Sequence, residues 1–493
     1  MKAILTIPFI ALLSFSGISQ GKFEQTPQIR AAYDLVMSLR FDEAKTQIEA
    51  IKRDDPQNLL VHYVENYLDF FTCYINEDKT EFNRLERNKD ARIALVKTGD
   101  PNSPYYLYLQ SSIRLHWALA RLKFSEYFTA FREVNKAFKL LNKNQKQFPD
   151  FMPNKKDLGI LHAMVGTIPD NYKWGVELFT NMSGSINQGK EEIKTVLNYA
   201  ENNEFIYEQE ARVLYAYLLM HLGNQSSDAW QLLNSSKLNP EKNPIAAFVL
   251  ANVAMRTGKN DKAIEFLKNR PTGSQFHPFP YFDFMLANAK LRRLDKDADQ
   301  YFLKYLKEFK GLHFIKESYA RLSWHAIIND DLQQFYAYNE QVKSNGTTTT
   351  GGDKNAQMDA EIPIIHHKAL LQARLLFDGG YYQKGYDILS PLSLSDFPDE
   401  RSKLEFTYRT GRLLHKLQKH PEAIGAYEKT INNGKDKRWY FACNAALQNG
   451  LIFEELKNNE RARFYFEKCI SISPSEHKTA LHQQAKAGLE RVK

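Results

Sequence analysis

Apolar residues recur along most of this 493-residue chain three or four positions apart, which is the spacing of one face of an α-helix. Ala247, Leu250, Ala251 and Ala254 illustrate the spacing. Stretches in which apolar and polar residues alternate, as they do along a half-buried strand, are almost absent. The pattern therefore predicts an all-α fold.

The clearest internal repeat covers residues 443–476. Small residues at its eighth and twentieth positions would let two antiparallel helices approach closely, and aromatic residues at its eleventh and twenty-fourth would fill the space beside them. Pro474 would end the second helix, because proline has no N–H to continue the hydrogen-bond ladder. The four packing positions are Gly450, Ala462, Phe453 and Phe466.

This unit resembles a tetratricopeptide repeat (TPR), a helical hairpin of about 34 residues. Residues 404–437 repeat the arrangement, residues 25–58 do so nearly as clearly, and residues 366–399 more weakly. The resemblance implies an α-α superhelix, a TPR-like solenoid of about ten to thirteen antiparallel helix pairs. Each pair would hide its apolar faces against its neighbours in the stack.

The N-terminal part combines a targeting signal with a helical block. Residues 1–19 begin with a lysine, continue with a short apolar core and end with small residues, as a cleavable signal peptide does. Residues 20–205 are expected to form a block that contains the unit 25–58 and irregular, longer helices such as 59–74 and 105–146.

The rest of the chain is expected to consist of two repeat blocks joined by a loop. TPR-like repeats would fill residues 206–343. Residues 344–359 lack periodicity and are rich in glycine and threonine, so we expect a flexible loop there. The C-terminal block, residues 360–493, would hold the units 366–399, 404–437 and 443–476 and a capping helix over 477–493.

Charge argues against a nucleic-acid partner. The chain has 66 Lys and Arg against 58 Asp and Glu, a net charge of +8. Basic and acidic residues alternate nearly everywhere, whereas nucleic-acid binders usually concentrate basic residues in one patch. After residue 19 no stretch approaches about 18 uninterrupted apolar residues, so we expect no transmembrane segment in the mature chain.

Residue motifs give no support for catalysis, and we expect no enzyme activity, catalytic residue, cofactor or metal ion. Residues 184–190 have the spacing of a phosphate-binding loop, but Glu191 stands where Ser or Thr would hold Mg²⁺. The turn-rich segment 166–190 is either a docking surface or a structural elbow. Cys443 and Cys469 could fall at the same end of one helix pair, as a disulfide or as two buried thiols.

The resemblance also implies a binding groove. In tetratricopeptide proteins the second, fifth, ninth and twelfth positions of the first helix of each pair line the concave face. Carried over to two consecutive units, these positions include Arg374, Phe377, Tyr408, Arg412 and His415. Two guanidinium groups with aromatic neighbours would suit an extended peptide that bears carboxylates. The alternative is a solvated groove wall without a ligand.

The preferred hypothesis is an exported scaffold, periplasmic or secreted, that binds a protein or peptide partner through a concave helical surface and associates with the cell envelope through its partners. One alternative is a carbohydrate-capture module of the envelope. A second, less favoured alternative is an enzyme with a site in residues 59–205.

Overall fold

The computed structural model describes residues 20–167, 182–222, 225–362 and 364–492. In these ranges the regular structure is helical apart from two isolated β-bridges, Gly21 with Gly99 and Lys22 with Asn58, which confirms the all-α class. The chain forms two compact units. One contains residues up to 71 together with 80–206, and the other contains 72–79 together with the chain from 207 onward. The expected signal peptide and residues 168–181 of the turn-rich segment lie outside the described ranges.

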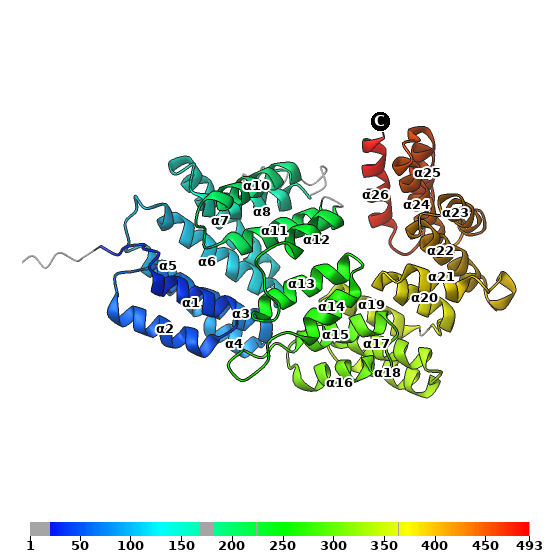
Figure 1. Ribbon diagram of the computed structural model, residues 1–493, viewed down its shortest axis with the longest axis horizontal. Coiled ribbons are helices and arrows are strands. Elements are labelled where there is room, and N and C mark those ends of the chain that lie inside the picture. Colours follow the sequence, from blue (N-terminus) through cyan, green and yellow to red (C-terminus); the bar gives the residue numbers. More distant parts are fainter. Residues whose placement is uncertain (1–19, 168–181, 223–224, 363, 493) are drawn as a thin grey trace, which may run out of the picture. The chain divides into compact units, whose positions relative to one another are not determined.

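The first unit is built from antiparallel helices of unequal length (Figure 1). The pair α1 and α2 occupies the predicted unit 25–58, and its small residues Ala32 and Ala44 are completely buried. The helices, including α3 with its C-terminal end in the second unit, are α1 (Pro27–Met37), α2 (Phe41–Asp54), α3 (Leu60–Asn76), α4 (Lys79–Leu85), α5 (Arg87–Val96), α6 (Pro104–Lys123), α7 (Tyr127–Gln147), α8 (Met152–Val165) and α10 (Ile186–Asn202).

The long helix expected over residues 105–146 is wrong, because the structure divides it into α6 and α7. Ser125, between the two helices, has φ of 60°, a left-handed conformation that ends a helix and lets the chain reverse. The two helices then pack against each other along their length. No glycine or proline marks this turn, so the apolar pattern runs through it without interruption.

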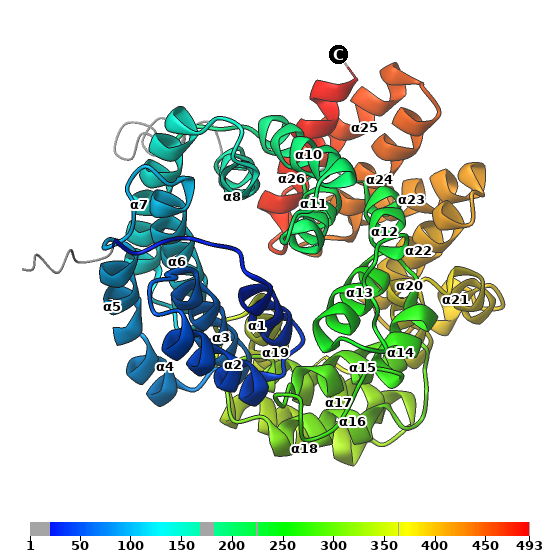
Figure 2. The same ribbon diagram turned by 60° about the vertical axis from the view of Figure 1, so that its left-hand side comes forward.

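The second unit is a succession of helical hairpins that can be followed from α11 to α26 in Figure 2. Its helices are α11 (Glu208–His221), α12 (Ser226–Asn234), α13 (Pro244–Arg256), α14 (Asn260–Lys268), α15 (Tyr281–Arg292), α16 (Ala298–Glu308), α17 (Ile315–Ile328), α18 (Leu332–Ser344), α19 (Gly351–Glu361), α20 (Lys368–Gly379), α21 (Tyr382–Leu389), α22 (Glu400–Lys416), α23 (His420–Gly434), α24 (Phe441–Glu455), α25 (Asn459–Ser471) and α26 (Lys478–Arg491), with a 3₁₀ turn at Leu394–Asp396.

Most hairpins turn in the same way. A residue in the left-handed conformation stands two positions before the second helix begins, and it allows the first helix to end and the chain to reverse within a few residues. In the part of the chain that the structure describes, seven hairpins share this placement, and the residues are Leu39, Ser125, Gly258, Asp330, Gly380, Gln418 and Lys457. The common turn shows that α6 and α7, like α17 and α18, are hairpins of the same kind as the repeats recognised in the sequence.

The predicted pairing of small with aromatic residues is confirmed in the C-terminal hairpins. A Cβ atom on Gly450 would lie 2.5 Å from the ring of Phe466, and one on Gly411 would lie 2.8 Å from the ring of Tyr427. Glycine is therefore required at both positions for α24 to meet α25 and for α22 to meet α23. The last helix, α26, covers α24 and α25 as the predicted capping helix.

The long helices bury one stripe rather than their whole circumference. In α7, Ala130, Ala137, Phe138 and Leu141 are buried at helical spacing, while Phe128 is exposed. Among the residues that the structure describes, no helix combines the length and the apolar character needed to span a lipid bilayer.

The flexible loop expected over residues 344–359 is also wrong. Only about half of it is irregular, and α19 begins at Gly351. Thr350 caps this helix by accepting a hydrogen bond from the Asp353 backbone N–H, and Ala356 and Ala360 are buried in a small apolar cluster with Ala320 and Val342. Tertiary packing against α17 and α18 thus outweighs the low helix propensity of the two glycines.

Candidate partner-binding surface

The first helices of successive hairpins form a row in the second unit. α13 packs against α15, α15 against α17 and α20, α20 against α22, and α22 against α24. Each of five helices in this row contributes an arginine in its second half or near its middle, because the hairpins repeat the same geometry. These are Arg256 on α13, Arg292 on α15, Arg321 on α17, Arg374 on α20 and Arg412 on α22.

Several of these arginines lie close enough to act on one another electrostatically. Burial lowers the pKa of Arg292, and the neighbouring Arg321 and Arg256 lower it further, while Asp378 and Glu317 act against them. Burial likewise lowers the pKa of Arg374, and Arg409 and Arg321 add to the effect. A guanidinium stays charged at neutral pH even after such a shift. The positive charge of the row is therefore partly offset by the carboxylates Asp378 and Glu317.

Aromatic rings support the guanidinium groups in the middle of the row. The guanidinium carbons of Arg321 and Arg374 lie 4.1 Å and 4.5 Å from the centre of the Trp324 ring. That of Arg412 lies 4.0 Å from the centre of the Phe377 ring. At these distances each guanidinium is attracted by the ring beneath it. We call Arg321, Trp324, Arg374, Phe377 and Arg412 the arginine–aromatic face.

The arginines of this face differ in their ionic partners. Arg321 pairs with Glu317 at 2.7 Å. Beside the face, Arg409 and Arg401 both pair with the buried Glu405. Burial alone would raise the pKa of Glu405, but its positive neighbours, mainly Arg409, lower that pKa to about 2. Arg374 and Arg412, by contrast, have no carboxylate within ion-pairing distance among the residues that the structure describes. Asp378 attracts both guanidinium groups only from beyond ion-pairing distance, so in the described part of the chain no carboxylate forms an ion pair with them.

The structure places the five residues expected to line the groove on two adjacent helices. Arg374 and Phe377 lie on α20, and Tyr408, Arg412 and His415 lie on α22. Arg374, Phe377, Arg412 and His415 are half-buried. Tyr408 is 0 % exposed, and its ring belongs to the core between α22, α23 and α24. Its assignment as a groove residue is therefore wrong, because the helix turns this position inward toward Tyr427 and Phe441.

His415 lies apart from the stacked arginines. Its side chain is near the end of α22, where it approaches His420 and Glu455 instead of an aromatic ring of the face. Burial and the neighbouring Lys416, His420 and Arg412 lower its pKa to about 4, so its imidazole is neutral at physiological pH.

Trp324 and Arg321 were missed by sequence reasoning. They belong to the hairpin of α17 and α18, which lacks the small and aromatic signature of the C-terminal repeats. The apolar spacing of Leu322, Ala326 and Ile327 marks a helix there but does not reveal that its neighbour in space is α20. That contact depends on the whole stack.

Comparison with known proteins identifies the repeat. A family model described as "Tetratricopeptide repeat" matches residues 445–476, within α24, α25 and the segment that follows. The chain therefore contains a tetratricopeptide repeat. No curated protein matches this chain.

Solved structures resemble it only weakly. The protein of "APC/C hetero-tetramer Cut9-Hcn1" aligns with 12% identity over 95% of this chain and 96% of that chain, with a TM-score of 0.25. Yeast Tom70 aligns with 12% identity over 94% of both chains, with a TM-score of 0.23. At such scores the likeness says nothing about the partner or the role of this chain.

Proposed function

We propose that this tetratricopeptide-repeat protein is a non-enzymatic scaffold that holds an acidic segment of a partner protein on the arginine–aromatic face. The observation that carries the proposal is that Arg374 and Arg412 rest on Trp324 and Phe377 and have no carboxylate partner among the described residues. A stacked guanidinium is held in place before a ligand arrives, so less conformational entropy is lost when it binds a carboxylate.

The spacing of the row favours an extended or helical segment over a compact ligand. The face continues through Arg292 and Arg256 on α15 and α13, so several carboxylates along a peptide can be bound in succession. Rows of this kind are how helical repeat proteins bind long segments. We further propose that the chain acts after export, in the periplasm or outside the cell, on the strength of the signal-like residues 1–19.

The test measures the affinity of the purified chain for fluorescent peptides by anisotropy. A peptide rich in Glu and Asp is compared with a peptide in which Gln and Asn replace them. Replacing Arg374 and Arg412 together with Ala should weaken binding of the acidic peptide by at least about tenfold, since each lost charge-assisted hydrogen bond to a carboxylate contributes about 1.5–3 kcal/mol.

The matched control replaces Arg84 and Arg87, two exposed arginines of the first unit, with Ala. This variant removes the same charge and should bind like the unchanged protein. Equal weakening in both double variants would show that only net charge matters and would overturn the assignment of the face. Binding of neutral oligosaccharides in place of acidic peptides would favour the carbohydrate-capture role.

A further inference from the structure

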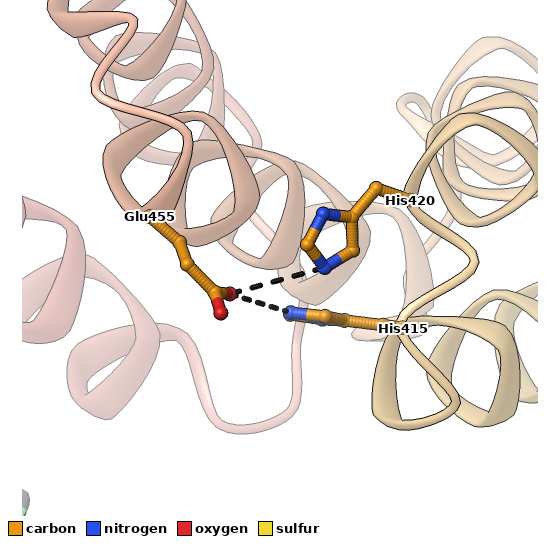
Figure 3. Close-up of side chains that lie close together, drawn as sticks. All are labelled: His415, His420 and Glu455. Carbon is orange, nitrogen blue, oxygen red and sulfur yellow. Dashed lines mark ion pairs between the residues drawn. The ribbon is translucent and has the colours of Figure 1, made fainter.

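Three helix ends meet beside the turn between α22 and α23. His415 lies in the last turn of α22, His420 is the first residue of α23, and Glu455 is the last residue of α24. Gln418, with φ of 61°, makes the tight turn that brings the two histidines together. Packing of α24 against both α22 and α23 then sets Glu455 opposite them (Figure 3).

The three side chains converge on one point. The Nε2 atoms of His415 and His420 lie 3.9 Å and 4.0 Å from the same carboxylate oxygen, Oε2 of Glu455. The imidazole rings are 5.9 Å apart between centres and nearly perpendicular. These distances are too long for hydrogen bonds, so the carboxylate does not hold the imidazoles by direct contact. The Nε2 atom of His420 is buried and makes no hydrogen bond in the structure.

The distances between the possible ligand atoms of these side chains are close to those around one bound metal ion. One ligand atom from each of the three residues can be chosen so that all lie within 4.8 Å of one another. Zinc binds imidazole nitrogen and carboxylate oxygen at about 2.0–2.2 Å, so two donors of one ion lie no more than about 4.3 Å apart. The nitrogen–oxygen distances from Glu455 to the two histidines both satisfy this limit. Ligand atoms in a tetrahedral site lie about 3.4 Å apart, so the half-exposed side chain of Glu455 must move by about half an ångström to complete it.

From this geometry we propose that His415, His420 and Glu455 form a binding site for a divalent transition-metal ion, with zinc as the best match. Two imidazoles and one carboxylate are a donor set that zinc uses in proteins. Ca²⁺ and Mg²⁺ prefer oxygen donors throughout and do not fit two nitrogen ligands. The site was not foreseen in the sequence, where we expected no metal ion.

The surroundings determine how tightly and in what form the ion is held. Arg412 and Lys416 are positive neighbours of His415, and they weaken the affinity for a cation. The solvent-exposed side of Glu455 leaves a fourth position that water can occupy, so the site is open rather than closed. The site does not depend on the proposed scaffold role, although Arg412 lies one turn before His415 on the same helix.

The test uses the full mature chain without an affinity tag, since a histidine tag would bind the same ions. Zn²⁺ is titrated calorimetrically, and Co²⁺ is used as a spectroscopic probe, because tetrahedral Co²⁺ absorbs strongly in the visible region. We expect one equivalent of either ion to bind. His420→Ala and Glu455→Gln should each weaken the affinity at least about tenfold, because each removes one of three ligands.

The matched control is His325→Ala, which removes one imidazole from α17 and leaves the three helix ends unchanged. It should bind like the unchanged protein. Circular dichroism reports whether His420→Ala folds, and Glu455→Gln, at the half-exposed position, supplies an independent variant if it does not. Absence of Zn²⁺ and Co²⁺ binding in the unchanged protein, or equal affinity in Glu455→Gln, would overturn the site. If the protein failed to bind acidic peptides but still bound Zn²⁺, the scaffold role would be contradicted and the proposed metal site would not.

Discussion

Gly258 and Gly380 lie backbone against backbone, 122 positions apart in the chain: a Cβ atom on Gly380 would come closer than 3.0 Å to the carbonyl oxygen of Gly258. Each glycine occupies the turn of its own hairpin in the left-handed conformation, with φ of 71° and 83°. Next to them the Tyr381 hydroxyl donates a hydrogen bond to Asp261 at 2.8 Å. These contacts join the hairpin of α20 and α21 to the hairpin of α13 and α14 in the second unit.

Replacing Gly380 with Ala should destabilise the second unit by about 2–4 kcal/mol, because the new methyl group meets a backbone atom and the left-handed conformation is strained for alanine. Chemical denaturation followed by circular dichroism measures the change. Gly425→Ala is the matched control, since a Cβ atom there meets nothing within 4 Å. That helical position should gain up to about 1 kcal/mol. If Gly380→Ala and Gly425→Ala changed the free energy of unfolding alike, the close contact between Gly380 and Gly258 would be contradicted.

Asp353, on α19, caps the neighbouring helix α17. Its carboxylate accepts hydrogen bonds from the backbone N–H groups of Phe314 at 2.7 Å and Glu317 at 3.0 Å, at the start of α17. Phe314 has no side-chain oxygen with which to cap that helix, so Asp353 supplies the acceptor from α19. Asp353→Ala should lower the free energy of unfolding by about 2 kcal/mol.

The comparison for Asp353 is Asp331→Ala, which removes the exposed N-cap of α18 and should cost about 1 kcal/mol. Hydrogen exchange gives a second readout. The amides of α17 should exchange faster in Asp353→Ala and stay unchanged in Asp331→Ala. Protection of α17 in both variants would show that Asp353 does not cap this helix.

His366 makes the stability depend on pH. Burial lowers its pKa to about 4, and although Glu405 attracts the charged form, the neighbouring Arg374, Arg401 and Arg409 repel it. In the unfolded chain the imidazole takes up a proton near pH 6.5, whereas in the folded chain it does so only near pH 4. The unfolded state therefore binds more protons in this window, and stability falls as the pH drops through it.

The substitution His366→Gln should remove this contribution. Between pH 6.5 and 4 the free energy of unfolding of the unchanged protein should fall more steeply, by up to about 1.4 kcal/mol per pH unit for one proton. Urea denaturation at a series of pH values compares the two proteins, and the other titrating groups affect both alike. Parallel curves would show that His366 titrates normally in the folded chain.

The three cysteines should be unreactive thiols in the native protein. All three are buried, and the sulfur atoms of Cys443 and Cys469 lie 3.6 Å apart. A disulfide requires about 2.05 Å. With a thiol reagent we expect no reaction before unfolding and three thiols per chain in guanidinium chloride, in protein kept free of reductant. A single reactive thiol after unfolding would show that Cys443 and Cys469 are bridged.

Sequence periodicity predicted the contacts between small and aromatic residues within a hairpin, because these contacts are local in the sequence. The pairs Gly411 with Tyr427 and Gly450 with Phe466 are separated by one turn and one helix, so the repeat spacing already implies their contact. It failed at α19, where Thr350 and two glycines resemble a loop and the helix forms because Ala356 and Ala360 pack against distant residues. It also failed at Tyr408, since a position number does not show which way a particular helix is rotated.

By itself, the sequence determined that this chain forms helical hairpins, because the contacts that define a hairpin close within about 34 residues and leave a periodic trace. Only the tertiary structure decided which hairpins become neighbours. It brought Arg374 over Trp324 and aimed His415, His420 and Glu455 at one point. Those arrangements depend on how each hairpin is rotated against the next, and that rotation is set by the packing of many side chains along the stack.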